Sequence, residues 1–229
     1  TIICCYARID GWSVGIVANQ REVVKNGKKE MQFGGVIYSD SADKASRFIM
    51  NCNQKKIPLV FLQDVSGFMV GSRSEHGGII KDGAKMVNAM SNSVVPKFTI
   101  VTGNSYGAGN YAMCGRSFNP RFLFSYPNSK SGVMGADQLA GVMEIVKRKS
   151  AESLNKEIDE KLLLEEKHNL AEQAEKKASV WHTTSEVWDD GVIDPRDTRK
   201  YLSMALSAVY NLSLIHISEP TRQAEISYA

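Results

Sequence analysis

The sequence predicts an α/β fold in one globular domain. Apolar runs typical of buried strands alternate with segments whose apolar residues recur at helical spacing. The first elements come in the order strand, strand, helix, strand, and strands and helices recur through two-thirds of the chain. Of the 229 residues, 43% are hydrophobic and 23% are charged, which is enough apolar material for one substantial core.

The chain opens with a predicted β-hairpin. Two β-rich runs, Ile2 to Ala7 and Trp12 to Ala18, flank Asp10-Gly11, a pair of residues that favours a tight turn. A lysine-rich stretch from Arg21 to Glu30 follows. Its polarity predicts a solvated loop.

A helix is predicted between Ser41 and Lys56, and a buried strand follows it. The apolar residues of one helical face are Ala42, Ala45, Phe48, Ile49 and Cys52, and the candidate N-caps are Ser39, Asp40 and Ser41. Pro58 closes this helix and opens the strand Leu59 to Leu62. The loop from Ser66 to Gly71 leaves the carboxyl end of that strand, where open α/β folds place ligand sites. Its apolar residues favour a binding loop over an ordinary surface turn.

A second helix and the central strand come next. Gly77 to Ser93 carries a predicted buried face made of Ile79, Ile80, Gly83, Ala84, Val87 and Met90. After Pro96, the uncharged run Phe98 to Val101 predicts a strand that is covered on both faces. Gly103 is expected to end this strand.

A side-chain-poor turn and helix start follow the central strand. Gly107, Ala108 and Gly109 let backbone N–H groups approach a ligand closely where they lack helical partners. Such amides can hold an anion or act as an oxyanion hole. Two alternatives are close packing of the helix on the sheet and a dinucleotide-binding turn, since Gly107, Gly109 and Ala112 fit G-x-G-x-x-A. The dinucleotide alternative is weakened because no carboxylate occurs near Pro127 to Ser131, where the ribose would need one.

The second half continues the alternation. Phe122 to Tyr126 and Ser131 to Met134 are predicted strands, and Gly135 opens a helix that runs from Ala136 to about Lys149. Glu152 to Lys177 predicts a charged helical hairpin or long helix, with Leu154, Ile158 and Leu162 as its packing stripe.

The last predicted helix begins with Asp194-Pro195-Arg196-Asp197, where proline occupies the first helical position. Its predicted buried residues are Leu202, Ala205, Leu206 and Val209.

Composition and motif searches exclude several classes. The net charge of +3 is too small to indicate a nucleic acid partner, and there is no apolar run of about 18 residues that would predict a membrane span. The four cysteines, Cys4, Cys5, Cys52 and Cys114, show no metal-binding or disulfide spacing and are expected to be buried thiols in a cytosolic protein. We expect no metal site. His76, His168 and His182 are expected to be structural or exposed, and Asp64 and Asp82 to act as caps or ion-pair partners.

Seven ordered motifs together resemble the carboxyltransferase subunit of biotin-dependent acyl-CoA carboxylases. They are Ala7 to Trp12 (ARIDGW), Gly67 to Gly71 (GFMVG), Gly83 to Met86 (GAKM), Ser105 to Gly115 (SYGAGNYAMCG), Tyr126 to Asn128 (YPN), Val133 to Gly135 (VMG) and Trp188 to Arg199 (WDDGVIDPRDTR). The sequence from Tyr106 to Tyr111 is more similar to the methylcrotonyl-CoA and glutaconyl-CoA branches of the family than to the propionyl-CoA and acetyl-CoA branches.

The resemblance implies a crotonase-like fold of stacked ββα turns, of which this chain matches the carboxyl-terminal domain. It implies carboxyl transfer from carboxybiotin, carried by a biotin carboxylase and biotin carrier partner, to an acyl-CoA. Active members form hexamers whose sites are shared between subunits. The implied location is the cytoplasm, or the mitochondrial matrix in a eukaryote.

The resemblance also implies roles for particular residues. The N–H groups of Ala108 and Gly109 would stabilise charge on the ureido oxygen of biotin. The implied walls of the biotin pocket are Gly67, Phe68, Gly71, Tyr106, Gly107 and Gly135. No protein acid, base or metal is required, because the freed biotin nitrogen would take the α-proton of the acyl-CoA.

Two segments depart from the family pattern. The insert from Arg21 to Ile37 is longer than expected. Residues 212–229 contain LSLIHISEPTR, which looks like translated adapter DNA, so we expect the domain to comprise residues 1–211. Besides the carboxylase, two alternatives stay open: a biotin-dependent acyl-CoA decarboxylase subunit, and a catalytically silent crotonase-like module for assembly or CoA binding.

Overall fold

The computed structural model describes residues 1–27, 29–154 and 158–210. Its strands are β1 (Ile2–Ile9), β2 (Trp12–Asn19), β3 (Val24–Lys25), β4 (Met31–Gln32), β5 (Val36–Ile37), β6 (Leu59–Val65), β7 (Gly67–Phe68), β8 (Lys97–Tyr106), β9 (Phe122–Ser125) and β10 (Lys130–Gly132). Its helices are α1 (Ser39–Gln54), α2 (Ser72–His76), α3 (Ile79–Ser91), α4 (Gly107–Ala112), α5 (Ala136–Ser153), α6 (Glu160–Ala178) and α7 (Val180–Ser185). Two 3₁₀ turns, Arg116–Phe118 and Pro195–Asp197, complete the set, and residues 198–210 are helical.

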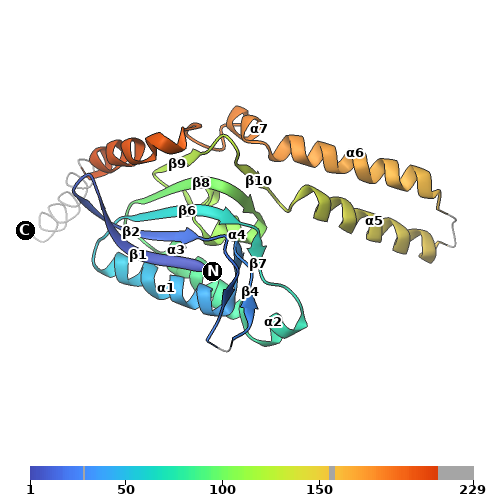
Figure 1. Cartoon of the computed structure of the whole chain (residues 1–229), viewed down its shortest axis with the longest axis horizontal. Coiled ribbons are helices and arrows are strands. Elements are labelled where there is room, and N and C mark those ends of the chain that lie inside the picture. The colour runs from blue at the N-terminus through green and yellow to red at the C-terminus, as the bar shows by residue number, and fades with distance from the viewer. Residues whose placement is uncertain (28, 155–157, 211–229) are drawn as a thin grey trace, which may run out of the picture.

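One twisted sheet organises the molecule (Figure 1). Its strands lie in the order β1-β2-β6-β8-β10, and β9 also pairs with β8. The predicted β1–β2 hairpin is confirmed as an antiparallel pair, whereas β2, β6, β8, β9 and β10 pair in parallel. The parallel strands therefore bring their carboxyl ends to the same edge of the sheet.

The hairpin turn offers a matched test of backbone strain. Gly11 has a φ of +85°, a conformation that costs an L-residue about 1–2 kcal/mol. A Cβ at Gly11 or at Gly27 would meet no atom within 4 Å, and Gly27 does not have a positive φ. We expect Gly11→Ala to lower the free energy of unfolding by about 1 kcal/mol, while Gly27→Ala changes it by less than about 0.5 kcal/mol. Urea denaturation measures both, and equal effects would contradict the strain argument.

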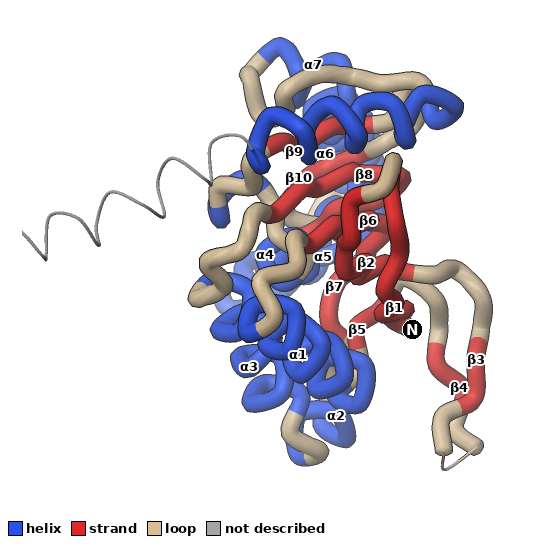
Figure 2. The backbone as a smooth tube through the Cα atoms, turned by 90° about the vertical axis from the view of Figure 1, so that its left-hand side faces the viewer, coloured by secondary structure: helices blue, strands red, loops and turns tan. Residues whose placement is uncertain are grey.

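Helices cover both faces of the sheet. Helices α1 and α3 pack on one face, and the helix of residues 198–210 lies on the other (Figures 1 and 2). The predicted burial of that last helix is confirmed, since Leu202, Ala205, Leu206 and Val209 are at most 5% exposed. Leu206 packs in the same cluster as Phe98 and Ile100 of β8. This helix therefore covers the second face of the central strand, as its uncharged run predicts.

The structure corrects several helix boundaries and faces. Helix α1 begins at Ser39 after Tyr38, whose backbone N–H donates to Ser41 Oγ at 2.9 Å, so none of the three candidate N-caps occupies the cap position. In α3, Ile79 and Gly83 are buried, but Ile80 and Ala84 are exposed. The predicted face was too wide because α3 covers the sheet side with a narrower stripe that also includes Met86.

Two corrections concern strands. The insert Arg21 to Glu30 is not only a loop, because Val24 and Lys25 pair with Met31 and Gln32 in a short antiparallel hairpin. Strand β8 continues through Gly103 to Tyr106. Gly103 fits inside the strand because the carboxylate of Asp64 packs against it, so close that a Cβ there would lie 2.6 Å from Asp64 Oδ1.

Helices α5 and α6 form a long antiparallel arm that extends away from the sheet (Figure 1). The predicted packing stripe was wrong, since Leu154 and Leu162 are about 60% exposed and Leu163 is buried instead. Glu144 of α5 makes ion pairs with Arg148 of the same helix and with Lys167 of α6. Some charges of the arm therefore link its two helices, besides facing solvent. The predicted domain end at residue 211 and the predicted non-native tail lie outside the described residues.

The cysteines need one correction. The four cysteines are all described and form no disulfide. Cys52 and Cys114 are buried as expected, and burial raises the pKa of Cys114 to about 11. Cys5 is exposed and Cys4 is half-buried, because both lie on the edge strand β1.

Candidate functional site at the start of helix α4

The predicted side-chain-poor turn forms the junction between β8 and α4. Gly107 has a φ of +54°, and a Cβ there would lie 2.9 Å from the carbonyl oxygen of Val133. Gly107, Ala108 and Gly109 are the first three residues of α4, so their N–H groups have no carbonyl partner within the helix. Ala108 is exposed, whereas Gly109 is buried.

A chain of buried hydrogen bonds fixes this helix on the sheet. Asn110 Nδ2 donates to Ser105 Oγ at 2.6 Å, and Ser105 Oγ donates to Gln63 Oε1 at 2.5 Å. Gln63 Nε2 then donates to the carbonyl oxygen of Met113 at 2.7 Å, just past the end of α4. Both ends of the helix are therefore tied to β6 and β8, and a fully satisfied buried network of this kind specifies one orientation.

Gly109 sits against the strand and loop that carry the predicted binding motif GFMVG. A Cβ at this position would lie 2.5 Å from Val65 Cγ2 and 3.2 Å from Gly67 Cα. The glycine is thus required for close approach of α4 to β6 and β7. Gly109, which packs inward, fits the close-packing alternative. Ala108, which is exposed, is compatible with the oxyanion interpretation.

A cavity of about 610 Å³ opens beside the start of α4. Its wall on the helix side is formed by Gly107, Ala108 and Asn110, and its wall on the side of β10 is formed by Ser131 and Gly132. Further lining comes from the ends of other strands and from the segment around Trp188 and Asp189. The cavity therefore lies where the carboxyl ends of parallel strands and an amide-rich helix start meet, a position that suits an anionic or strongly polarised oxygen.

Asp189 is a cavity residue that the sequence did not single out on its own. It is 5% exposed, and its Oδ2 accepts a hydrogen bond from Thr184 Oγ1 at 3.0 Å. Its Oδ1 is buried and has no hydrogen-bond partner among the described residues. Asp189 occurred in the predictions only as part of the motif WDDGVIDPRDTR, and no local pattern distinguishes it from Asp190.

Asp190 has a different, structural role. Its Oδ2 accepts the backbone N–H of Leu123 at 2.7 Å, and its backbone N–H donates to the carbonyl of Leu123 at 2.7 Å. The segment thereby continues the sheet beside β9, with a bridge between Ser125 and Val192. This pairing holds Asp189 at the cavity.

The remaining predicted pocket residues are distributed over separate surfaces. Phe68 packs on α3, where a Cβ at Gly83 would lie 2.9 Å from the Phe68 ring, and it lines an apolar groove of about 320 Å³ together with Ala108. Gly135 is the N-cap of α5 and lies against the side chain of Gln138. Tyr106 is 8% exposed, and burial raises the pKa of its hydroxyl. Ala108 is the residue that connects the groove with the cavity.

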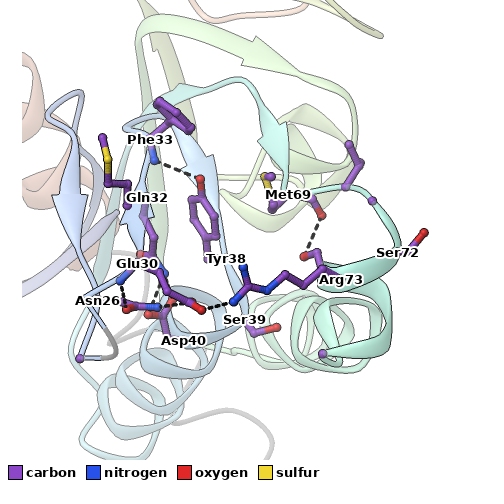
Figure 3. Close-up of a pocket in the computed structure, with 16 residues that line it drawn as sticks. Asn26, Glu30, Gln32, Phe33, Tyr38, Ser39, Asp40, Met69, Ser72 and Arg73 are labelled. Carbon is purple, nitrogen blue, oxygen red and sulfur yellow. Dashed lines mark hydrogen bonds and ion pairs between the residues drawn. The ribbon is translucent and has the colours of Figure 1, made fainter.

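Gly71 borders a third hollow, of about 740 Å³, between the insert and the loop before α2 (Figure 3). Here Arg73 pairs with Glu30, and Glu30 accepts a hydrogen bond from Asn26 at 3.0 Å. Gln32 Nε2 donates to Asp40 at 2.9 Å. The insert is therefore tied to α1 and α2, and it approaches the binding loop at Gly71 but not the cavity at Ala108.

Asp64 and Asp82, two carboxylates that the sequence predicts to act as caps or ion-pair partners, both make ion pairs. Asp64 pairs with Arg21 at 3.3 Å and accepts the backbone N–H of Asn104 at 2.9 Å, and Asp82 pairs with Lys85 at 3.0 Å. Within the described part of the chain, no group of three or more His, Cys, Asp and Glu side chains could hold a metal ion. None of the described helices is long and apolar enough to cross a bilayer.

The fold and the cavity define the class of protein to which the chain belongs. The family model for the carboxyl transferase domain matches residues 1–224, and the chain belongs to this family. The chain has the crotonase-like α/β fold of carboxyltransferase β subunits.

Three comparisons refine the family. The chain is 44% identical, over 92% of its length and 34% of the relative, to the mitochondrial methylcrotonoyl-CoA carboxylase beta chain of Dictyostelium discoideum. It is 44% identical, over 90% of its length and 36% of the relative, to the biotin-dependent 3-methylcrotonyl-coenzyme A carboxylase beta1 subunit of Mycobacterium tuberculosis. A transcarboxylase 12S structure described as a hexamer with methylmalonyl-coenzyme A bound matches 92% of this chain and 37% of its own, with a TM-score of 0.74 and 33% identity. The chain spans about a third of the length of these relatives.

Proposed function

We propose that this chain provides the carboxyl-terminal, biotin-accepting part of an acyl-CoA carboxyltransferase. The observation that carries the proposal is the start of α4, where the N–H of Ala108 has no helical partner and the residue borders a 610 Å³ cavity. Membership of the carboxyl transferase family gives that geometry its chemical meaning.

The residues around the cavity fit the urea group of biotin. A urea carbonyl accepts hydrogen bonds, and the amides at the start of α4 offer donors to it.

Carboxybiotin would supply the carboxyl group. The N–H groups of Ala108 and Gly109 would donate to the urea oxygen as negative charge develops on it, and one such donor is worth about 3 kcal/mol in the transition state. The network from Gln63 through Ser105 to Asn110 would keep these donors in place without reorganisation. Phe68 of β7 lines the groove that meets the cavity at Ala108, and it would form an outer wall of the site, with Gly107 shaping the backbone of the cavity itself.

The relatives support a proposal for the substrate and the partners. We propose an acyl-CoA similar to methylcrotonoyl-CoA, or propionyl-CoA, as the carboxyl acceptor. A biotin carboxylase and biotin carrier subunit would deliver the biotin, and the complete protein would assemble as a homo-oligomer, with the transcarboxylase hexamer as a precedent. In a eukaryote it would act in mitochondria, as the name of the Dictyostelium relative indicates, and otherwise in the cytoplasm.

A hybrid enzyme tests the proposal. Residues 1–210 of this chain replace the matching segment of the Dictyostelium methylcrotonoyl-CoA carboxylase beta chain, and the hybrid is combined with the biotin-bearing partner of that enzyme. We expect biotin-dependent carboxylation of methylcrotonoyl-CoA, measured as fixation of labelled bicarbonate, with propionyl-CoA and glutaconyl-CoA as comparison substrates. An assembled hybrid without turnover on any of them would favour the silent-module alternative and overturn the proposal.

A further inference from the structure

A buried carboxylate in the cavity has an unmet hydrogen-bonding requirement. Asp189 is 5% exposed, and only its Oδ2 has a partner, the hydroxyl of Thr184. Within the described residues, no donor contacts Oδ1. Burying a carboxylate oxygen without a donor is costly, because the desolvation of that oxygen is not compensated.

The surroundings of Asp189 do not supply the missing donor. Arg116, a cationic side chain of the cavity wall, pairs with Asp190 at 3.5 Å. Thr183, another wall residue, donates its hydroxyl to the carbonyl of Val180 at 3.1 Å. The indole of Trp188, which is about half exposed, lies on the same wall and packs edge-on against His182. A donor for Oδ1 is therefore expected to come from a ligand in the cavity.

We propose that Asp189 is a ligand-binding residue that accepts a hydrogen bond from a urea N–H of biotin. The inference rests on the proposed function, and it adds the residue that would recognise the side of the urea opposite the amides of Ala108 and Gly109. A cyclic urea combines a carbonyl with two adjacent N–H groups, so it can meet helix amides and a carboxylate in one cavity. Trp188 precedes Asp189 in the chain and lines the same cavity, so a ligand that binds there changes the surroundings of its indole.

The test compares Asp189→Asn with Asp197→Asn in the full chain of 229 residues. Asp197 is an exposed carboxylate beyond the cavity wall, so it serves as the matched control. In the Asp189 variant, the amide oxygen keeps the bond from Thr184 and turns an NH₂ group toward the ligand, where a donor would face a donor. The probe is biotin methyl ester, with calorimetry for affinity and tryptophan fluorescence for the change at Trp188. Thermal unfolding of each variant verifies that it is folded.

We expect Asp189→Asn to weaken binding of the ester at least tenfold and to remove the fluorescence change, while Asp197→Asn binds like the wild type. An ester with both urea nitrogens methylated should bind the wild type at least tenfold more weakly and should suffer no further loss in Asp189→Asn.

Four outcomes would overturn the inference. Unchanged affinity of Asp189→Asn leaves the proposed function standing but removes the role of Asp189. If methylation weakens binding of the ester equally in the wild type and in Asp189→Asn, the loss comes from steric hindrance and not from a hydrogen bond to Asp189. Wild-type binding that is insensitive to methylation excludes an N–H contact even if the variant does not fold. Absence of ester binding by the wild type overturns the inference together with the proposed biotin site, whereas the hybrid assay still tests carboxyl transfer separately.

Discussion

Replacing Ala108 by proline is expected to lower carboxyl transfer by the hybrid enzyme about a hundredfold. Ala108 lines the cavity, and proline at this position removes the backbone N–H that we propose as a donor; one oxyanion-hole donor is worth roughly 10²–10³ in rate. The substitution should leave the fold intact, because proline is tolerated in the first turn of a helix and Ala108 is exposed. The preceding residue, Gly107, has no Cβ to collide with the proline ring.

The control for this substitution is Ala108→Gly, which also changes the side chain but keeps the N–H. We expect this variant to retain turnover within a few-fold of the hybrid. The measurement is the initial rate of labelled bicarbonate fixation at saturating methylcrotonoyl-CoA, with urea denaturation of each variant. Full turnover in Ala108→Pro, with an unchanged unfolding transition, would exclude the backbone of α4 as a stabiliser of the reacting oxygen.

Local patterns predicted the strands better than the helix faces. The first residues of β6 and the middle of β8 are buried, so residues 59–62 and 98–101 appear as uncharged runs with little ambiguity. In α3 and α6, apolar residues occur on more than one face, and which face packs is decided by contacts with distant elements. Ile80 borders the groove beside Phe68, and Leu162 is exposed on the arm, although both fit a helical stripe.

The candidate site also contains residues that a local pattern predicts and residues that it does not. Gly107 to Gly109 could be predicted because backbone chemistry requires small residues in a short local pattern. Gln63 and Asp189 could not, because each gains its role from partners far away in the sequence. Gln63 binds Ser105 and the carbonyl of Met113, and Asp189 reaches the cavity only because the segment after α7 pairs with β9.

Gly109 provides the sharpest test of how the fold holds the donors. We expect Gly109→Ala to lower the free energy of unfolding by about 2–3 kcal/mol, because the new Cβ would lie 2.5 Å from Val65 Cγ2 in a packed interior. It should also lower turnover of the hybrid, since α4 must move away from β6 to relieve the contact. Chemical denaturation and bicarbonate fixation measure the two effects.

The second substitution Val65→Ala removes both Val65 methyl groups that the new Cβ would meet. In the Val65→Ala, Gly109→Ala double variant, the stability loss should therefore be smaller than the sum of the single losses by at least about 1 kcal/mol. The contact with Gly67 Cα at 3.2 Å persists, so recovery should be incomplete. Additive losses would show that Gly109 acts through its own backbone conformation and not through the approach of α4 to β6. The position of the amides would then depend on the turn at Gly107 alone.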